Sequence, residues 1–406
     1  MDFAPTEEQT AAQGLAARIF GDLSTHERLA GAGTGTDAEL WKELCAAGLT
    51  AAVEEIGLLG LVLLLEEQGR TTAQVPFAAS CVYGLLAVAA HGTDEQRERL
   101  LPPLRDGTAV ATGAFPARGG MRADDEGRLS GSVPYVPWLR DASLVLVADS
   151  DRGLWIVRTG DPGVGTEPVE TTAPWSAARL VLDGARGERL GGEGAPEERR
   201  TGIVGAGARG GPGVVGAGAH RESRAGARGE PGVVGAGARG EPGVVGAGAC
   251  GEPGVGAYEA VLAASRIAFA GLQAGVCAGS LARAVAHTNT REQFGRPLST
   301  KQAVLLRAAD AHMDTEAIRV TAYEAAWRYD TGLPYGPQAL TAAWWASEAG
   351  KRVVHAGQHL HGGTGADLDH PVHRHFLWGR QLDAYLGCGS EVLQELGGLL
   401  VKEGPE

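Results

Sequence analysis

Apolar residues recur at helical spacing through the first hundred residues of the chain. Between residues 11 and 19 they fall three and four positions apart, which places them on one side of a helix. Thr36-Asp37 predicts the start of another helix, because a Thr or Asp side chain accepts hydrogen bonds from the unpaired N–H groups of a first turn. Asp94 begins a further short helix. These patterns predict a helical N-terminal domain over residues 1–107.

The pattern changes to short β-type segments between about residues 109 and 190. These segments are rich in Val, Leu, Tyr and Trp and are separated by Gly, Asp and Pro, as is typical of strands. The predicted strands are Leu129–Val136, Ser143–Ala148, Leu154–Val157 and Ala178–Leu182. We expect an antiparallel sheet or barrel as a middle β domain over residues 108–191.

Helical spacing returns in residues 257–406. Gln302–Thr331 contains neither Gly nor Pro and predicts a long helix. Tyr258–His287 carries Gly271, Gly275 and Gly279. Glycine at every fourth position lines one face of a helix, and we interpret it as a surface for close helix packing rather than a ligand site.

An 11-residue repeat separates the β domain from the C-terminal helices. GARGEPGVVGA occurs at 226–236 and again at 237–247. The 11-residue period breaks the three-residue glycine phase that a collagen triple helix requires. Because so few apolar residues cannot offset chain entropy, residues 192–256 are predicted to be a disordered surface insert. A tolerated repeat expansion is favoured over a functional segment.

Charge and cysteine content narrow the functional classes. The net charge of −13 disfavours nucleic acid as a partner, because phosphate backbones are bound by clustered Lys and Arg. The five cysteines lack metal-ligand spacing, which indicates a reduced, cytoplasmic compartment. The acidic N-terminus does not resemble a signal peptide, and the longest apolar runs, Ile56–Leu65 and Val75–Ala90, predict no membrane span.

Two C-terminal segments carry candidate chemistry. The first, Thr290–Pro297, places Arg291 beside Phe294, and a guanidinium fork suits a pyrophosphate. The second, Gln358–Gly365, contains a Gly362-Gly363 turn, whose backbone N–H groups can approach a dinucleotide closely. Taken alone, a glycine pair after a helix is more often a simple helix end.

Together, and in this α-β-α order, the two segments resemble the acyl-CoA dehydrogenase family. The resemblance implies an α+β fold with an N-terminal helical domain, a middle β-barrel domain and a C-terminal four-helix bundle, with FAD as cofactor and an acyl-CoA substrate. In that family both segments grip the ADP half of an FAD bound mainly by the neighbouring subunit. The FAD contacts so implied are Arg291, Gln293, Phe294, Gln302, Gly362 and Gly363, with Gln358 and His359 competing for the position of a family glutamine.

The catalytic base of that family is missing from both of its usual places. The family's Tyr-Glu-Gly reads Tyr385-Leu386-Gly387 here, and its alternative Glu-Arg pair reads Ser265-Arg266. Neither Leu386 nor Ser265 can act as this base, and loss of a positioned base typically lowers a rate by roughly 10²–10⁴-fold. No catalytic residue is therefore predicted in this chain.

The elements that face the flavin ring in the family are also altered. Ala114-Phe115-Pro116 stands where many members have Thr-Glu-Pro, and Tyr135-Val136-Pro137 stands where they have Trp-x-Thr. A glycine-rich loop is lost between Val53 and Leu63. The ADP-gripping segments are thus kept while the chain's own ring and base positions are eroded. This pattern indicates the non-base subunit of an α2β2 acyl-CoA dehydrogenase whose partner carries the catalytic glutamate.

Two other hypotheses stay open at this point. A self-sufficient homotetrameric flavoenzyme (a dehydrogenase, oxidase or monooxygenase) would need a displaced base, for which Asp367, Asp369 and Asp383 are candidates, although surface or capping roles are favoured for them. A non-catalytic scaffold of the same fold is the third hypothesis. The dense C-terminal histidines have no firm zinc spacing, so no metal site is predicted, and structural or nucleotide-contact roles are favoured for them.

Overall fold

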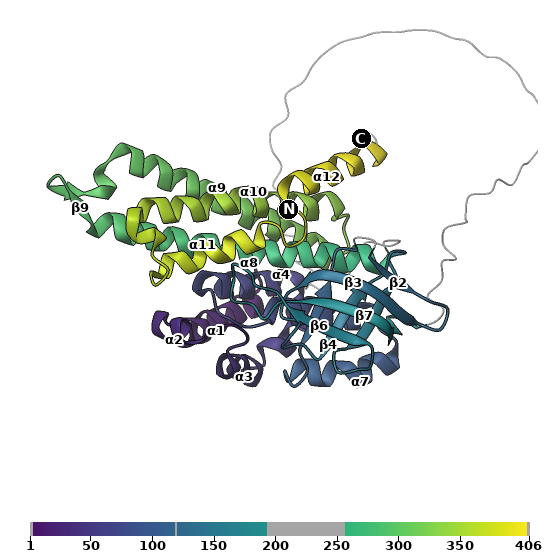
Figure 1. Cartoon of the computed structure of the whole chain (residues 1–406). Coiled ribbons are helices and arrows are strands. Elements are labelled where there is room, and N and C mark those ends of the chain that lie inside the picture. Colours follow the sequence, from purple (N-terminus) through teal and green to yellow (C-terminus); the bar gives the residue numbers. More distant parts are fainter. Residues whose placement is uncertain (1–2, 118–119, 193–255, 404–406) are drawn as a thin grey trace, which may run out of the picture. The chain divides into compact units, whose positions relative to one another are not determined.

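The computed structural model describes residues 3–117, 120–192 and 256–403, and these residues follow the order helices, strands, helices (Figure 1). The predicted repeat insert, apart from its two end residues, lies outside them. The N-terminal elements are α1 (Glu7–Leu23), α2 (His26–Gly31), α3 (Ala38–Ala46), α4 (Leu49–Thr71), α5 (Phe77–Ala79), the π-helical η1 (Ser80–Leu86), α6 (Ala87–His91) and α7 (Asp94–Arg105).

The predicted helix starts are confirmed by their caps. The Asp37 carboxylate accepts the Leu40 N–H at 3.1 Å at the start of α3. Thr93 and Gln96 cap each other's backbone at the start of α7, a reciprocal pair that satisfies two N–H groups at once. α4 contains one non-helical residue, Gly57, at which the helix is kinked.

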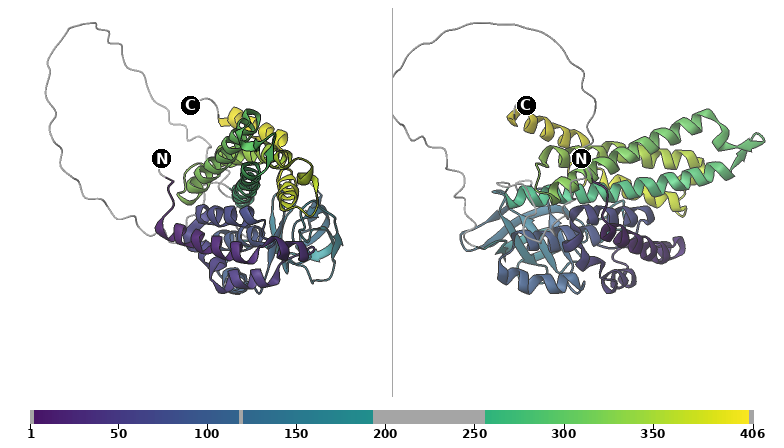
Figure 2. Two further views of the ribbon diagram at one scale, coloured as in Figure 1. Left: turned by 90° about the vertical axis from the view of Figure 1, so that its left-hand side faces the viewer. Right: turned by 180° about the vertical axis from the view of Figure 1, so that it is seen from behind.

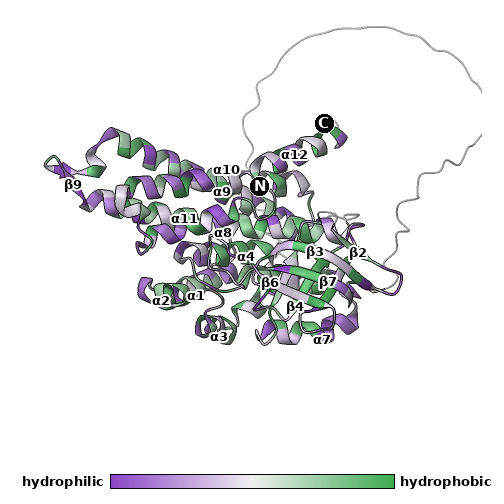
Figure 3. Cartoon of the chain, viewed as in Figure 1, coloured by the Kyte–Doolittle hydropathy of each residue, from purple (hydrophilic) through white to green (hydrophobic). Residues whose placement is uncertain are grey.

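The middle strands form two four-stranded sheets, ordered β1-β4-β5-β8 and β2-β3-β7-β6. Their bounds are β1 (Ala111–Ala114), β2 (Met121–Ala123), β3 (Arg128–Val136), β4 (Leu144–Ala148), β5 (Leu154–Arg158), β6 (Val164–Pro168), β7 (Ala178–Arg186) and β8 (Glu188–Arg189). Residues of both sheets share one buried cluster, and the hydrophobic colour in β3 and β7 of Figure 3 belongs to it. The expectation of purely antiparallel strands was wrong for β1 and β4, which pair in parallel, because the long segment between them allows such a crossover.

The C-terminal elements are α8 (Ala257–Thr290), β9 (Glu292–Gln293), β10 (Arg296–Pro297), η3 (Leu298–Thr300), α9 (Gln302–Asp330), α10 (Gly336–His361), η4 (Gly362–Ala366), α11 (Pro371–Leu382) and α12 (Gly389–Glu403). The two long predicted helices are thus confirmed as α8 and α9. α8 lies along α4 on one side and α9 and α10 on the other (Figure 2).

The glycine row of α8 makes the close contact with α4 that the sequence predicted. A methyl group on Gly275 would overlap the backbone carbonyl of Glu66, and one on Gly271 or Gly279 would crowd the backbone at Val62 or Arg70. The helices can approach this closely only because these side chains are absent. By length and composition α8 could cross a membrane, as could α3 and α4 taken as one bent span, but the apolar window of α8 is wholly buried in the fold.

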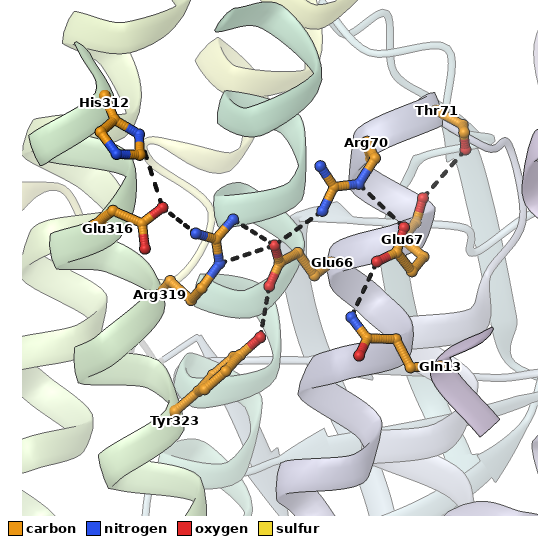
Figure 4. A network of polar contacts seen from close by, with 9 residues as sticks. All are labelled: Gln13, Glu66, Glu67, Arg70, Thr71, His312, Glu316, Arg319 and Tyr323. Atoms are coloured by element: carbon orange, nitrogen blue, oxygen red, sulfur yellow. Dashed lines mark hydrogen bonds and ion pairs between the residues drawn. The ribbon is translucent and has the colours of Figure 1, made fainter. Parts of the chain in front are cut away.

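A buried ion network joins α4 to α9 (Figure 4). Glu66 is 2% exposed and accepts hydrogen bonds from Arg319 at 2.6 Å, Arg70 at 3.2 Å and the Tyr323 hydroxyl at 2.8 Å. Glu316 pairs with the same Arg319. Because a buried carboxylate is tolerated only when it is paired, this network fixes how the two helices face each other.

Candidate functional site

The first sequence motif forms an exposed hairpin between α8 and α9. The Arg291 N–H donates to the His287 carbonyl at 2.8 Å as α8 ends, and the Leu298 N–H donates to the Arg291 carbonyl at 2.9 Å, which closes the hairpin. Phe294 lies at the tip with a φ of 56° and is 93% exposed. The Lys301 ammonium lies over its ring, 4.6 Å from the ring centre. Gln293 and Gln302 are likewise exposed.

The second motif forms the turn at the end of α10. Gly362 ends the helix with a φ of 63°, a conformation that strains other residues, so the helix-end role of this glycine is confirmed. The Gln358 amide donates to the Gly365 carbonyl at 3.1 Å, which closes the turn from inside. His359, Gly362 and Gly363 are exposed. The geometry thus separates the two competing residues: Gln358 is used by the fold, whereas His359 lies at the surface.

Stacked histidine rings hold the two motifs together. His287, at the end of α8, stacks on His361, at the end of α10, with ring centres 4.6 Å apart. His361 in turn contacts His370 at 4.9 Å. Segments about seventy residues apart in the sequence therefore lie side by side, as a common binding site requires. Within the described residues, neither the Arg291 nor the Arg296 side chain forms an ion pair, so both are available to an anion.

The altered ring-facing positions meet in a cluster of aromatic side chains. Phe115 lies between Tyr83 and Tyr258, with ring centres 5.2 Å and 5.6 Å away and interplanar angles of 24° and 12°. The Arg152 guanidinium covers the far face of Tyr258 at 5.4 Å. We call Tyr83, Phe115 and Tyr258 the aromatic column. Phe115 is 4% exposed and Tyr83 is 2% exposed, so a planar ligand has no open face to stack on.

The missing-base positions border the same column. The Tyr385 hydroxyl lies 3.0 Å from that of Tyr83, and its ring packs edge-on against Phe269 and Tyr135. Leu386, next to it, is 6% exposed, and the Ser265 hydroxyl donates to the Leu262 carbonyl at 2.8 Å. Burial raises the pKa of Tyr83 to about 12 and raises the pKa of Tyr385 well above its usual value, so both phenols are neutral at physiological pH and neither is a base.

The carboxylates close to these positions are already engaged. Glu395 forms a bidentate pair with Arg266 at 2.8 Å and 2.6 Å. Asp383 lies buried between Arg380 and the Ser347 hydroxyl, which gives it a structural role. Asp367 and Asp369 are exposed in the turn after α10. Over the part of the chain that the structure describes, no group of His, Cys, Asp and Glu is arranged to hold a metal ion.

Comparison with known proteins decides the family. Models of the "Acyl-CoA dehydrogenase, N-terminal domain" and "Acyl-CoA dehydrogenase, C-terminal domain" match residues 6–108 and 252–396. Acyl-CoA dehydrogenase FadE27 of Mycobacterium tuberculosis is 30% identical to this chain over 98% of each. The chain belongs to the acyl-CoA dehydrogenase family. It is therefore a family oxidoreductase, with the family's N-terminal helical, middle β and C-terminal helical domains.

Two solved structures are similar over nearly the whole chain. A structure described as the Tcur3481-Tcur3483 steroid ACAD G363A variant is 36% identical, with a TM-score of 0.79 over 98% of both chains. The ChsE4-ChsE5 complex from Mycobacterium tuberculosis is 27% identical, with a TM-score of 0.79 over 100% of both chains. Butyryl-CoA dehydrogenase from Megasphaera elsdenii shares the fold, with a TM-score of 0.74 over 99% of this chain and 100% of its own.

The family uses FAD, and the residues of this chain fit the two halves of that cofactor differently. The exposed arginines, the exposed Phe294 and the glycine turn fit an ADP group. The aromatic column does not fit a flavin ring, because Phe115 already has an aromatic neighbour on each face. Sequence reasoning missed Tyr83, Tyr258 and Phe269 of this cluster, since aromatic residues in apolar helices carry no signal that distinguishes them from ordinary core residues.

Proposed function

We propose that this chain is the non-base subunit of a hetero-oligomeric, FAD-dependent acyl-CoA dehydrogenase. Its two exposed motifs, the 291–297 hairpin and the 358–365 turn, bind the ADP half of an FAD. The partner subunit binds the flavin ring of that FAD and carries the catalytic glutamate. The single observation that carries the proposal is the contrast between these uncovered motifs and the filled aromatic column.

The contacts proposed for the ADP half are Arg291, Gln293, Phe294, Gln302, His359, Gly362 and Gly363, with Gln358 supporting the turn from within. Arg291 and the backbone N–H groups of the glycine turn would bind pyrophosphate oxygens. Phe294 would cover the adenine, a flat apolar ring that an exposed aromatic side chain binds by stacking. When bound, FAD accepts the hydride removed from the acyl-CoA. This chain's part is to hold and orient the cofactor.

Apolar side chains on α9 support the existence of a partner. Leu305, Leu306, Met313 and Val320 are between 48% and 62% exposed and recur along one stretch of a single helix. Apolar surface of this kind is typical of a face that another protein covers. The similar ChsE4-ChsE5 structure is a complex of two named proteins, which favours an α2β2 assembly with a related but different chain over a homotetramer.

The substrate proposed is an acyl-CoA thioester with a bulky, steroid-type acyl group. This rests on the similar Tcur3481-Tcur3483 protein, which is described as a steroid acyl-CoA dehydrogenase. The acyl group would bind in the partner's cleft, because the corresponding space in this chain contains the aromatic column.

Co-expression with an acyl-CoA dehydrogenase encoded next to this chain tests the proposal. We expect a stable complex that carries flavin and oxidises acyl-CoA, while the isolated chain does neither. Arg291→Ala in this chain should strip flavin from the complex. Arg122→Ala, which removes another exposed arginine on β2, should leave flavin in place. An isolated chain that binds FAD stoichiometrically and dehydrogenates acyl-CoA would refute the proposal.

A further inference from the structure

The histidine stack lies directly beneath the two motifs and is surrounded by positive charge. Arg283, His287 and Arg291 follow one another at four-residue spacing along the end of α8, so they share one side of it. Although the Arg283 side chain reaches the surface, surrounding atoms desolvate it enough to lower its pKa. Within the described residues Arg283 forms no ion pair, and the acidic group that bears on the stack is Asp367, near His370.

The three rings differ in their hydrogen bonds. The His361 Nδ1–H donates to the Gly357 carbonyl at 2.7 Å, and this residue is 6% exposed. The His370 Nδ1 accepts the Val372 N–H at 3.2 Å and caps α11, so a proton there would break the cap. The His287 ring forms no hydrogen bond with any described residue. It can therefore gain a proton without losing a bond.

The charges around His287 oppose that proton in the free chain. Burial, His361 and Arg291 together lower the pKa of His287. An anion of two or more charges bound between Arg291 and the glycine turn would reverse the sign of the local field. Nearby opposite charge favours the charged form of a titrating group.

We propose that His287 takes up a proton from solvent when a diphosphate group binds at the two motifs, so that the stack adds positive charge only to an occupied site. Arg283 acts as a further long-range positive charge for the same group. The inference deepens the proposed function and rests on it for the identity of the ligand. It makes diphosphate binding stronger at lower pH and couples it to proton uptake by His287.

Imidazole NMR of the full chain tests this directly, with inorganic pyrophosphate as the probe. Signals of the eleven histidines are followed against pH with and without pyrophosphate, and His287→Gln assigns the signal of interest. We expect the titration midpoint of His287 to rise by about one pH unit, the order of shift produced by a close opposite charge. His312, an exposed histidine on α9, is the internal control and should not respond. An unchanged His287 midpoint, or an equal shift at His312, overturns the inference.

A second measurement separates this inference from the proposed function. In the flavin-loaded complex, FAD affinity should fall by about tenfold in total as pH rises through the midpoints of free and ligand-bound His287, and His287→Gln should remove this dependence. A complex that forms and holds FAD with no such dependence refutes proton uptake and leaves the subunit assignment intact. Failure to form any complex refutes the subunit assignment, while the pyrophosphate titration of the isolated chain still decides the inference.

Discussion

Restoring a carboxylate at the usual base position should not create an enzyme. In Leu386→Glu the glutamate would stand at the position that the resemblance to the family assigns to the base. If only the base were missing, this change would confer activity on the isolated chain. The structure predicts instead that the new side chain enters a filled core, because Leu386 is 6% exposed and packs in the cluster that includes Tyr385 and Phe115.

The cost can be worked from that burial. Loss of a buried leucine side chain removes about 2 kcal/mol of apolar stabilisation. A glutamate forced to stay protonated at pH 7, with its pKa raised by about three units, costs about 4 kcal/mol more. We therefore expect the variant to unfold about 5–6 kcal/mol more easily at neutral pH. Because folding would raise the pKa of the introduced glutamate, the loss in free energy of unfolding should become smaller as pH falls toward 4.

The assay has three parts. Urea unfolding at about pH 5 and pH 8 measures stability, flavin absorbance measures bound FAD, and acyl-CoA oxidation with an artificial acceptor measures activity. Leu386→Gln is the matched control, because glutamine has the shape of glutamate but no titrating group. Its stability relative to the wild type should therefore not depend on pH. A folded Leu386→Glu chain that binds FAD without a partner and oxidises acyl-CoA would refute the reasoning, because it would require an open cleft in this chain.

Three further changes test the packing and the exposed motifs. Gly275→Ala should lower the free energy of unfolding in urea by about 1–3 kcal/mol, because its methyl group meets the α4 backbone. Gly14→Ala, which has open space around it, should raise the free energy of unfolding by about 0.5–1 kcal/mol. Equal effects of the two changes would contradict the close helix contact. Burial raises the pKa of Asp330 to about 6, so the folded state favours the protonated form of this side chain. As pH rises from about 4 to 6, the free energy of unfolding of the wild type should therefore fall by up to about 3 kcal/mol relative to that of Asp330→Asn, with no further change above about pH 6. A difference between the two proteins that does not vary with pH would contradict this. Phe294→Ala should leave the free energy of unfolding unchanged within about 0.5 kcal/mol but weaken FAD binding in the complex on the order of tenfold. Leu368→Ala, which also removes an exposed apolar side chain, should leave FAD binding unchanged.

The parts of the fold that depend on neighbours along the chain could be predicted from sequence. The extents of α8 and α9 follow from local helix preference, and Asp37 marks a helix start because a cap acts within three residues. The row of glycines at 271, 275 and 279 also predicted a close helix contact correctly, because their spacing repeats the turn of the helix itself. The identity of the opposing helix, α4, could not be derived this way.

The aromatic column could not be predicted, because its members come from distant parts of the chain. Tyr83 lies in η1, Phe115 follows β1, and Tyr258 begins α8. In the sequence each of these residues looks like an ordinary core residue, because the cluster forms only when the domains pack together. The histidine stack was hidden in the same way: the sequence shows a dense run of histidines after residue 354, but His287 joins it only through the packing of α8 on α10.

Flavin stoichiometry in the purified assembly tests the central claim most directly. We predict one FAD for each pair of unlike chains, and we predict that Arg291→Ala in this chain alone removes that flavin while the two chains stay associated. An FAD bound by this chain in isolation, or an assembly with one flavin for every chain, would contradict the account.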